Sequence, residues 1–229
     1  MSELTPSASP PLTLGAILYP GFELLDVFGP LEMFASVGRN LLAIHMIAER
    51  AGPVAAGTVA DGPVGPRVVA DFGFDDAPAL DLLLVPGGIG TFTELANPKM
   101  IGFLRERARA ARITASVCTG SALLAKAGIL DGHRATSNKQ VFDLAVAQGA
   151  AVDWIAAARW VDDGAVVTSS GVSAGMDMAL AIIARLFGTE AAEAIAIGTE
   201  YTWHRDSGVD PFIAHLNQMT PMLGALGKA

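Results

Sequence analysis

The chain is poor in cysteine: Cys118 is the only one among its 229 residues. A single cysteine excludes an intrachain disulfide and any zinc site built from several cysteines. The four histidines show no spacing typical of metal ligands, so we expect no metal site. A chain that cannot form an internal disulfide suits a reducing compartment, and we therefore expect a cytoplasmic protein.

The sequence also lacks a long apolar run and an excess of basic charge. Hydrophobic residues make up 52% of the chain, but no stretch offers the roughly 20 uncharged residues needed to cross a membrane. The opening residues, MSELTPSASPPL, show neither the basic nor the apolar region of a secretory signal. The formal net charge of −8 disfavours nucleic acid, which binds basic surfaces. We expect neither a membrane nor a nucleic-acid partner.

Apolar runs alternate with helical patterns along most of the chain. Buried strands are expected over residues 13–19, 41–49, 81–85 and 113–117. Helices are expected over residues 22–38, 98–112, from 120 onwards, and over 138–150, 174–188 and 189–201. Continuous apolar strands between helices indicate an α/β fold, doubly wound, with a mostly parallel sheet covered by helices on both faces.

Glycine and proline residues indicate where helices break and where turns form. Gly29-Pro30 should kink or restart the first helix. Residues 52–78 are rich in Gly and Pro and predict a small β-hairpin excursion, and Asp163-Gly164 predicts a hairpin over residues 158–171. We expect a disordered leader over 1–12, one domain over 13–205, and a C-terminal extension over 206–229 packed on that domain.

Cys118 lies where an apolar strand meets a helix of small residues, in ITASVCTGSALLAKAGIL. The order small residue, any residue, nucleophile, any residue, glycine is typical of a nucleophile elbow. Such a turn predicts that Cys118 has φ > 0 or another sparsely allowed backbone conformation. The start of the helix should lower the pKa of the thiol. The alternative is a small buried hydrophobic residue.

Two other strand ends supply partners for a nucleophile. The amides of Gly87 and Gly88, after DLLLVP, could bind an oxyanion, although a Gly-Gly pair also makes an ordinary turn. Asp26 is an acid in the apolar segment ELLDVFGP, and its alternative role is to cap a helix near Phe28. No histidine lies beside Cys118 in the sequence; Thr119 follows it instead.

The segments DVFGPLEMFA, VPGGIGT, SVCTGSALLAKAGILDGHRAT and TSSGVSAGMDMALAI resemble the ThiJ/PfpI superfamily over about residues 14–205. That superfamily has a flavodoxin-like sheet and is related to class I glutamine amidotransferases. Within it, the sequence is most similar to isocyanide hydratases. The resemblance implies Cys118 as nucleophile, Asp26 as acid/base group and Thr119 as a hydrogen-bonding neighbour. It also implies a small-molecule substrate, no cofactor, and a homodimer with its sites near the interface.

The sequence departs from its relatives in three places. Proteases of the superfamily carry Cys-His-Gly at the elbow, where this chain has Cys-Thr-Gly, so peptidase activity is not expected. Hydratase-like sequences often read ATTHW where this one reads ATSNK, so Asn138 replaces a histidine. Many relatives are regulators fused to a helix-turn-helix domain. Because no basic helical pair precedes Ala229, we do not expect that role.

The leading hypothesis is hydration of isocyanides to N-substituted formamides by Cys118 and Asp26. The alternatives are a glyoxalase or deglycase acting on 2-oxoaldehydes, and a redox sensor or ligand-binding protein in which Cys118 is oxidised. Val172 could approach the site from its loop, while Ser173 and Asp177 are interpreted as a helix cap. Residues 201–206 form a polar-aromatic patch, interpreted as solvated surface or a dimer contact.

Overall fold

The computed structural model describes residues 10–57 and 65–219, and it is organised around a six-stranded sheet. The strand order is β2-β1-β5-β6-β10-β9, and every neighbouring pair is parallel except β9 and β10. Its strands are β1 (Leu12–Ile17), β2 (Leu42–Ile47), β5 (Leu82–Val85), β6 (Ile113–Ser116), β9 (Trp160–Asp163) and β10 (Val166–Ser169). The expected doubly wound, mostly parallel α/β fold is confirmed.

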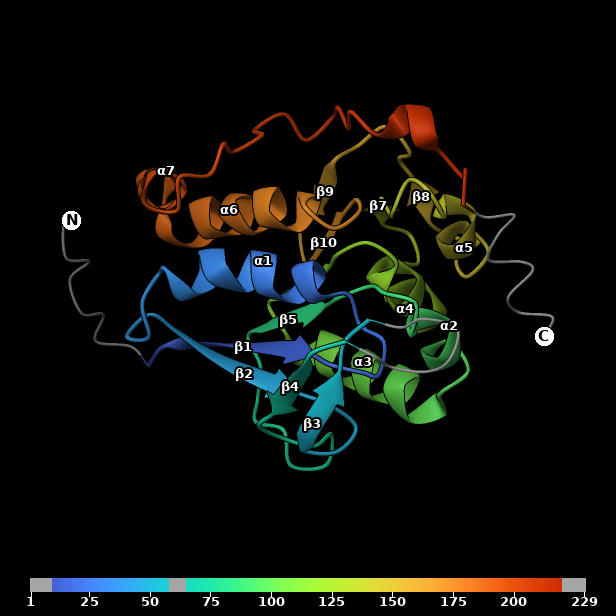
Figure 1. Ribbon diagram of the computed structural model, residues 1–229, viewed down its shortest axis with the longest axis horizontal. Coiled ribbons are helices and arrows are strands. Elements are labelled where there is room, and N and C mark those ends of the chain that lie inside the picture. The colour runs from blue at the N-terminus through green and yellow to red at the C-terminus, as the bar shows by residue number, and fades with distance from the viewer. Residues whose placement is uncertain (1–9, 58–64, 220–229) are drawn as a thin grey trace.

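Helices cover both faces of this sheet. They are α1 (Leu24–Ala35), α2 (Thr91–Glu94), α3 (Pro98–Ala110), α4 (Gly120–Lys126), α5 (Phe142–Val146), α6 (Ala174–Phe187) and α7 (Thr189–Gly198). Figure 1 shows α1, α6 and α7 together on one face and α3 and α4 on the other. Because both faces are covered, all residues of β5, β6 and β10 are buried, which explains why these strands carry no charged residue.

Two helices differ from the expectation. Helix α1 continues through Pro30 without a restart, although Pro30 cannot donate the helical hydrogen bond to the carbonyl of Asp26. Helix α5 begins only at Phe142, not at Asn138. The side chain of Asn138 accepts the N–H of Gln140 at 2.8 Å, and this local bond holds the preceding residues in a loop rather than a helix.

Smaller elements extend the sheet core. Strands β3 (Gly52–Ala55) and β4 (Arg67–Ala70) pair antiparallel and form the expected excursion; residues 58–64, which connect them, lie outside the described residues. Strands β7 (Arg134–Ala135) and β8 (Asp153–Trp154) form a short parallel pair that the sequence patterns did not indicate. The β9–β10 hairpin turns at Gly164, whose φ of 80° favours glycine.

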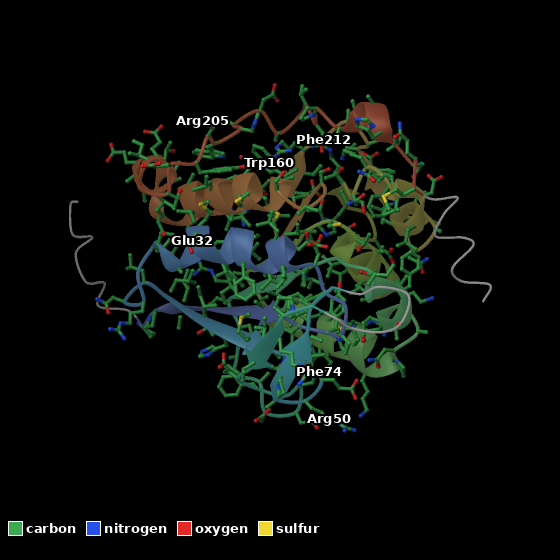
Figure 2. The ribbon with its side chains drawn as sticks, viewed as in Figure 1. Glu32, Arg50, Phe74, Trp160, Arg205 and Phe212 are labelled. Atoms are coloured by element: carbon green, nitrogen blue, oxygen red, sulfur yellow. The ribbon has the colours of Figure 1, made fainter. Side chains whose placement is uncertain are left out.

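The described residues begin just before β1 and continue past α7 to residue 219. Strand β1 begins at Leu12, so the last residue of the expected leader belongs to the sheet, and residues 1–9 lie outside the described residues. After α7 the chain crosses over α6 to the short 3-10 helix η1 (Ile213–His215) near α5 (Figure 1). Figure 2 shows Arg205 and Phe212 along this crossing, on the side of the molecule away from Phe74.

We name residues 207–219 the C-terminal segment. It lies against the domain through backbone hydrogen bonds: Arg159 donates to Ser207 at 2.8 Å, and Asp210 donates to Ala157 at 2.9 Å. Residues 220–229 lie outside the described residues. Among the residues that the structure describes, no helix combines the length and the apolar character needed to cross a membrane.

Asp177 does not cap α6, and Ser173 occupies the N-cap position without a capping hydrogen bond from its side chain, contrary to the expectation. The Asp177 side chain is fully buried and forms an ion pair with Arg159, whose Nε and Nη2 lie 2.7 and 2.6 Å from its Oδ2. Its Oδ1 accepts the Tyr201 hydroxyl at 3.1 Å and the His204 N–H at 2.9 Å. This carboxylate therefore ties β9, α6 and the chain after α7 together.

Replacing Asp177 with Ala should lower the free energy of unfolding by about 3–5 kcal/mol, because Arg159 would remain buried without its counter-ion. Urea unfolding measures the change. The matched control is Glu193→Ala, which removes an exposed ion pair to Arg205 at 2.9 Å and should cost less than about 1 kcal/mol. Equal losses in the two variants would contradict this interpretation of the buried pair.

Candidate active site

Three loops meet at the carboxyl edge of the sheet. Asp26 lies in α1 after β1, Gly87 and Gly88 follow β5, and Cys118 follows β6. Strand β1 lies between β2 and β5, so the chain leaves β1 towards one side and β5 towards the other. Parallel sheets of this order open a crevice at such a switch point, and the candidate residues gather there.

The backbone at Cys118 is left-handed, with φ of 58°, which confirms the expected strain. Its N–H donates to Ser170 at 3.0 Å, and its carbonyl accepts the hydroxyls of Ser121 at 3.0 Å and Ser137 at 3.2 Å. Gly120 permits the turn, because a Cβ there would collide with the carbonyl of Val85. The small residues around the elbow therefore fold the chain back beneath the thiol.

The sulfur of Cys118 is nearly buried, with 6% of the residue exposed. Asn138 Nδ2 donates to Sγ at 3.0 Å, and the backbone N–H groups of Thr119 and Val172 also interact with the sulfur. Burial raises the pKa of the thiol well above its ordinary value, and the charge of Asp26 raises it further. The expected lowering by the helix is therefore wrong: α4 is short, and desolvation outweighs the three donors.

Asp26 is fully buried next to this thiol. Its Oδ2 accepts the Gly87 N–H at 2.7 Å, while Oδ1 has no hydrogen-bond partner among the described residues. Burial raises the pKa of Asp26 to about 7; the Gly87 N–H lowers it, the charge of Glu23 raises it, and the interaction with Cys118 lowers it. The alternative of a helix cap is wrong, since α1 follows Glu23 and has no side-chain cap.

Gly87 and Gly88 occupy the expected loop but do not present free amides. The Gly87 N–H is bound to Asp26, and the Gly88 N–H donates to the Thr119 hydroxyl at 3.1 Å. A Cβ on Gly87 would lie 2.5 Å from the Thr119 nitrogen and 2.9 Å from the Cys118 Cβ. The glycines therefore bring the β5 loop against the elbow and position Asp26 and Thr119, in place of the expected oxyanion site.

A chain of hydroxyls that the sequence patterns did not indicate fixes Thr119. Its Oγ1 lies 2.8 Å from that of Thr91, which lies 3.1 Å from the Tyr19 hydroxyl. Tyr19 in turn donates to the carbonyl of Pro86 at 2.7 Å. If Gly88 N–H donates to Thr119, Thr119 to Thr91, Thr91 to Tyr19 and Tyr19 to Pro86, each of these three hydroxyls both accepts and donates one hydrogen bond.

The remaining candidates divide between the site and the surface. Val172 contacts the sulfur through its N–H and has φ of 45°, which is strained for a β-branched residue. In the segment 201–206, Tyr201 and His204 donate hydrogen bonds to Asp177 rather than to Cys118, and Arg205 stacks over the Trp203 ring at 4.8 Å. Among the described residues, no group of His, Cys, Asp and Glu is arranged to hold a metal ion.

The raised pKa of Asp26 predicts a pH-dependent effect of Asp26→Asn on stability. The folded protein holds the Asp26 proton more tightly than the unfolded chain, so the stabilisation is complete below the ordinary pKa of 3.8 and is lost as pH rises through about 7. The stability of wild type minus that of Asp26→Asn should therefore fall between these limits, by at most about 1.4 kcal/mol per pH unit. Urea unfolding across the window measures this difference. A difference that stays constant or grows with pH would contradict the assignment.

Comparison with known proteins places these residues in a family. The DJ-1/PfpI family model matches residues 16–185. The isonitrile hydratase of Pseudomonas putida is 34% identical over 190 residues, which cover 83% of this chain and 78% of the relative. The HTH-type transcriptional regulator GbdR of Pseudomonas aeruginosa is also 34% identical, over 81% of this chain, but this chain spans only half of the regulator's length.

Solved structures agree with this placement. A ThiJ/PfpI family protein from Pseudomonas syringae aligns with a TM-score of 0.78 and 27% identity, over 99% of this chain and 94% of that one. The fold of Drosophila melanogaster DJ-1beta aligns with a TM-score of 0.71 at 20% identity, over 84% of this chain and 100% of that one. The elbow at Cys118 and the sheet that carries it therefore belong to a member of the DJ-1/PfpI family.

Proposed function

We propose that this protein hydrates isocyanides to N-substituted formamides, with Cys118 as nucleophile and Asp26 as the group that moves protons. Two lines of evidence support the proposal. The chain is 34% identical to an isonitrile hydratase, isonitrile being another word for isocyanide. A buried carboxyl whose pKa lies near 7 adjoins the buried thiol, as a reaction that transfers protons at neutral pH requires.

The first half of the proposed reaction adds the thiol across the isocyanide carbon. The Asp26 carboxylate takes the proton of the Cys118 thiol as the sulfur attacks the terminal carbon of R–N≡C. The carbon–sulfur bond forms, and negative charge develops on that carbon. Asp26 then delivers the proton to the carbon, which leaves a thioimidate, R–N=CH–S–Cys118, and a carboxylate ready for the next step.

The second half adds water and releases the product. The Asp26 carboxylate takes a proton from water as the oxygen attacks the thioimidate carbon, and the same proton passes to the substrate nitrogen. The resulting R–NH–CH(OH)–S–Cys118 collapses when its carbon–sulfur bond breaks. The hydroxyl proton returns to the sulfur through Asp26, so the products are R–NH–CHO and the free thiol.

The observation that carries the proposal is where the site places its proton donor and its amides. Attack on an isocyanide puts charge on a carbon, which needs a proton rather than an oxyanion hole. Asp26 adjoins the sulfur, whereas the Gly87 and Gly88 amides are bound to Asp26 and Thr119. The sulfur is only 6% exposed, which suits a slender, linear, uncharged group with its electrophilic carbon at the tip.

The test is a formamide assay on several small isocyanides with wild type and two variants. Cys118→Ala should abolish turnover. Asp26→Asn keeps the size of the side chain but cannot transfer a proton, so turnover should fall about 100-fold or more. Thermal unfolding of each variant controls for loss of the fold, and a glyoxalase assay on a 2-oxoaldehyde runs in parallel.

The outcomes distinguish a hydratase from a glyoxalase or deglycase. Absence of formamide from every isocyanide tested would overturn the proposal. Turnover of the 2-oxoaldehyde instead would favour a glyoxalase or deglycase. A relative with that activity in its name, Deglycase TK1284 of Thermococcus kodakarensis, is 27% identical to this chain. Formamide production at full rate by Asp26→Asn would leave the reaction in place and remove Asp26 from it.

We also propose that the protein forms a homodimer through the apolar surface beside the site. Leu25 and Phe28 flank Asp26 on α1 and are 40% and 43% exposed, while Ile89 and Phe92 follow Gly88 and are 36% and 39% exposed. Light scattering at micromolar concentration should give twice the chain mass of 23.6 kDa. Phe28→Asp should give the monomer, while the control Ile197→Asp on α7 should remain dimeric. A monomeric wild type would refute the dimer.

A further inference from the structure

Asn138 reaches the reactive sulfur from a loop that the proposed mechanism does not use. We name residues 136–140 the site loop. Asn138 Oδ1 accepts the Gln140 N–H at 2.8 Å, and Nδ2 donates to Sγ of Cys118 at 3.0 Å. The first bond fixes the orientation of the amide, because only its oxygen can accept from a backbone N–H. The group that faces the sulfur is therefore a donor.

We propose that Asn138 is a further catalytic residue, which stabilises negative charge on the Cys118 sulfur, and that Lys139 positions it. The proposal rests on Cys118 being the nucleophile of the proposed function. Sulfur carries negative charge twice in that reaction, when it attacks and when it leaves. A hydrogen bond to a charged atom is strong where water is excluded, and Cys118 is nearly buried.

The side chain of Lys139 is buried and held by three hydrogen bonds and one ion pair. The residue is only 2% exposed, and its Nζ donates to Thr136 Oγ1 at 2.8 Å and to the carbonyls of Ala158 at 2.7 Å and Ser137 at 3.2 Å. Its counter-ion is the buried Asp210, at 3.7 Å. A lysine in these surroundings fixes the path of the site loop on both sides of Asn138.

The C-terminal segment closes this arrangement from outside. Asp210 belongs to it, and its residues Asn217 and Met219 donate backbone N–H groups to the carbonyls of Lys139 at 2.7 Å and Gln140 at 3.0 Å. The segment therefore holds the side chain of Lys139 at one point and the backbone of the site loop at two others. Through this contact, a part of the chain far from Cys118 in sequence supports a donor on its sulfur.

Gly171 provides a way to move the amide without changing it. A Cβ at this position would lie 2.7 Å from Asn138 Nδ2, and the backbone of Gly171 does not require glycine. The end of the Asn138 side chain would have to shift. Gly171→Ala should therefore displace the donor from the sulfur while leaving Asn138 in place.

The first experiment follows alkylation of Cys118 by iodoacetamide across neutral and alkaline pH. Asp26 and Tyr19 are the titratable groups that also face Cys118, and both stay unchanged. Burial holds the pKa of the thiol well above its ordinary value, so this whole pH range lies below that pKa. Removing one donor to the thiolate should raise the pKa by about one unit, and the alkylation rate should then fall about threefold at every pH, because fewer thiolates form but each is more nucleophilic. We expect this result for Asn138→Ala and for Gly171→Ala.

Asn138→Asp separates charge stabilisation from loop shape. The aspartate keeps the size of the side chain and can still accept the Gln140 N–H, but it turns an acceptor towards the sulfur. Alkylation should slow at least as much as in Asn138→Ala. If Asn138→Asp reacts like wild type while Asn138→Ala is slow, the residue only shapes the loop, and the proposal is overturned. Wild-type rates in both variants overturn it as well.

A double-mutant cycle tests the positioning role of Lys139. Lys139→Met keeps the apolar stem and should slow alkylation in the wild-type background. It should add less than a twofold change in the Asn138→Ala background, because the donor it positions is already absent. Asp210→Asn, which removes the counter-ion without changing shape, should follow the same pattern. Additive losses would show a general structural effect and refute the positioning role.

Cys118→Ala separates failure of this proposal from failure of the proposed function. If iodoacetamide labels wild type no faster than Cys118→Ala, Cys118 is not a nucleophile and the proposed function fails with it. If Cys118 is labelled but the Asn138 variants react like wild type, only the role of Asn138 fails. Thermal unfolding of each variant confirms that the rates refer to folded protein.

Discussion

The left-handed backbone at Cys118 is the constraint on which the site depends. A residue with a Cβ at φ of 58° costs about 1–2 kcal/mol, so its surroundings must hold it there. The carbonyl of Ser170 accepts the Cys118 N–H, and the hydroxyls of Ser121 and Ser137 donate to the Cys118 carbonyl. Val172, whose N–H faces the same sulfur, is strained as well. Two strained residues around one atom indicate that the fold is organised to present that atom.

Burial at this turn also sets the electrostatics of the site. Exclusion of water disfavours both the Cys118 thiolate and the Asp26 carboxylate, so burial raises the pKa of each group. The Gly87 N–H offsets part of this effect for Asp26 and leaves its pKa near 7. The Asp26 carboxyl is therefore partly protonated at neutral pH, and the donors around the sulfur offset part of the effect of burial on the pKa of the thiol.

Local patterns in the sequence were sufficient for the fold and for the strained turn at Cys118. The apolar runs specified the parallel strands, and the spacing of small residues around Cys118 indicated a strained turn. Contacts between distant loops were not accessible in this way. Asn138 lay in a segment whose apolar pattern predicted a helix, and the buried bonds of Lys139 depend on the C-terminal segment. The pKa of Cys118 was misjudged because desolvation depends on packing that no local pattern reveals.

The glycines after β5 show how one sequence feature can serve a different purpose from the expected one. Close approach is what Gly87 provides, since a side chain there would collide with Thr119 and Cys118. Once the loops are this close, the Gly87 and Gly88 amides find acceptors in Asp26 and Thr119 rather than in a substrate. The donors left around the reaction centre, on Thr119, Val172 and Asn138, all face the sulfur. This distribution supports the proposed reaction, in which charge passes between sulfur and carbon and Asp26 supplies the proton, over one that accumulates charge on a carbonyl oxygen.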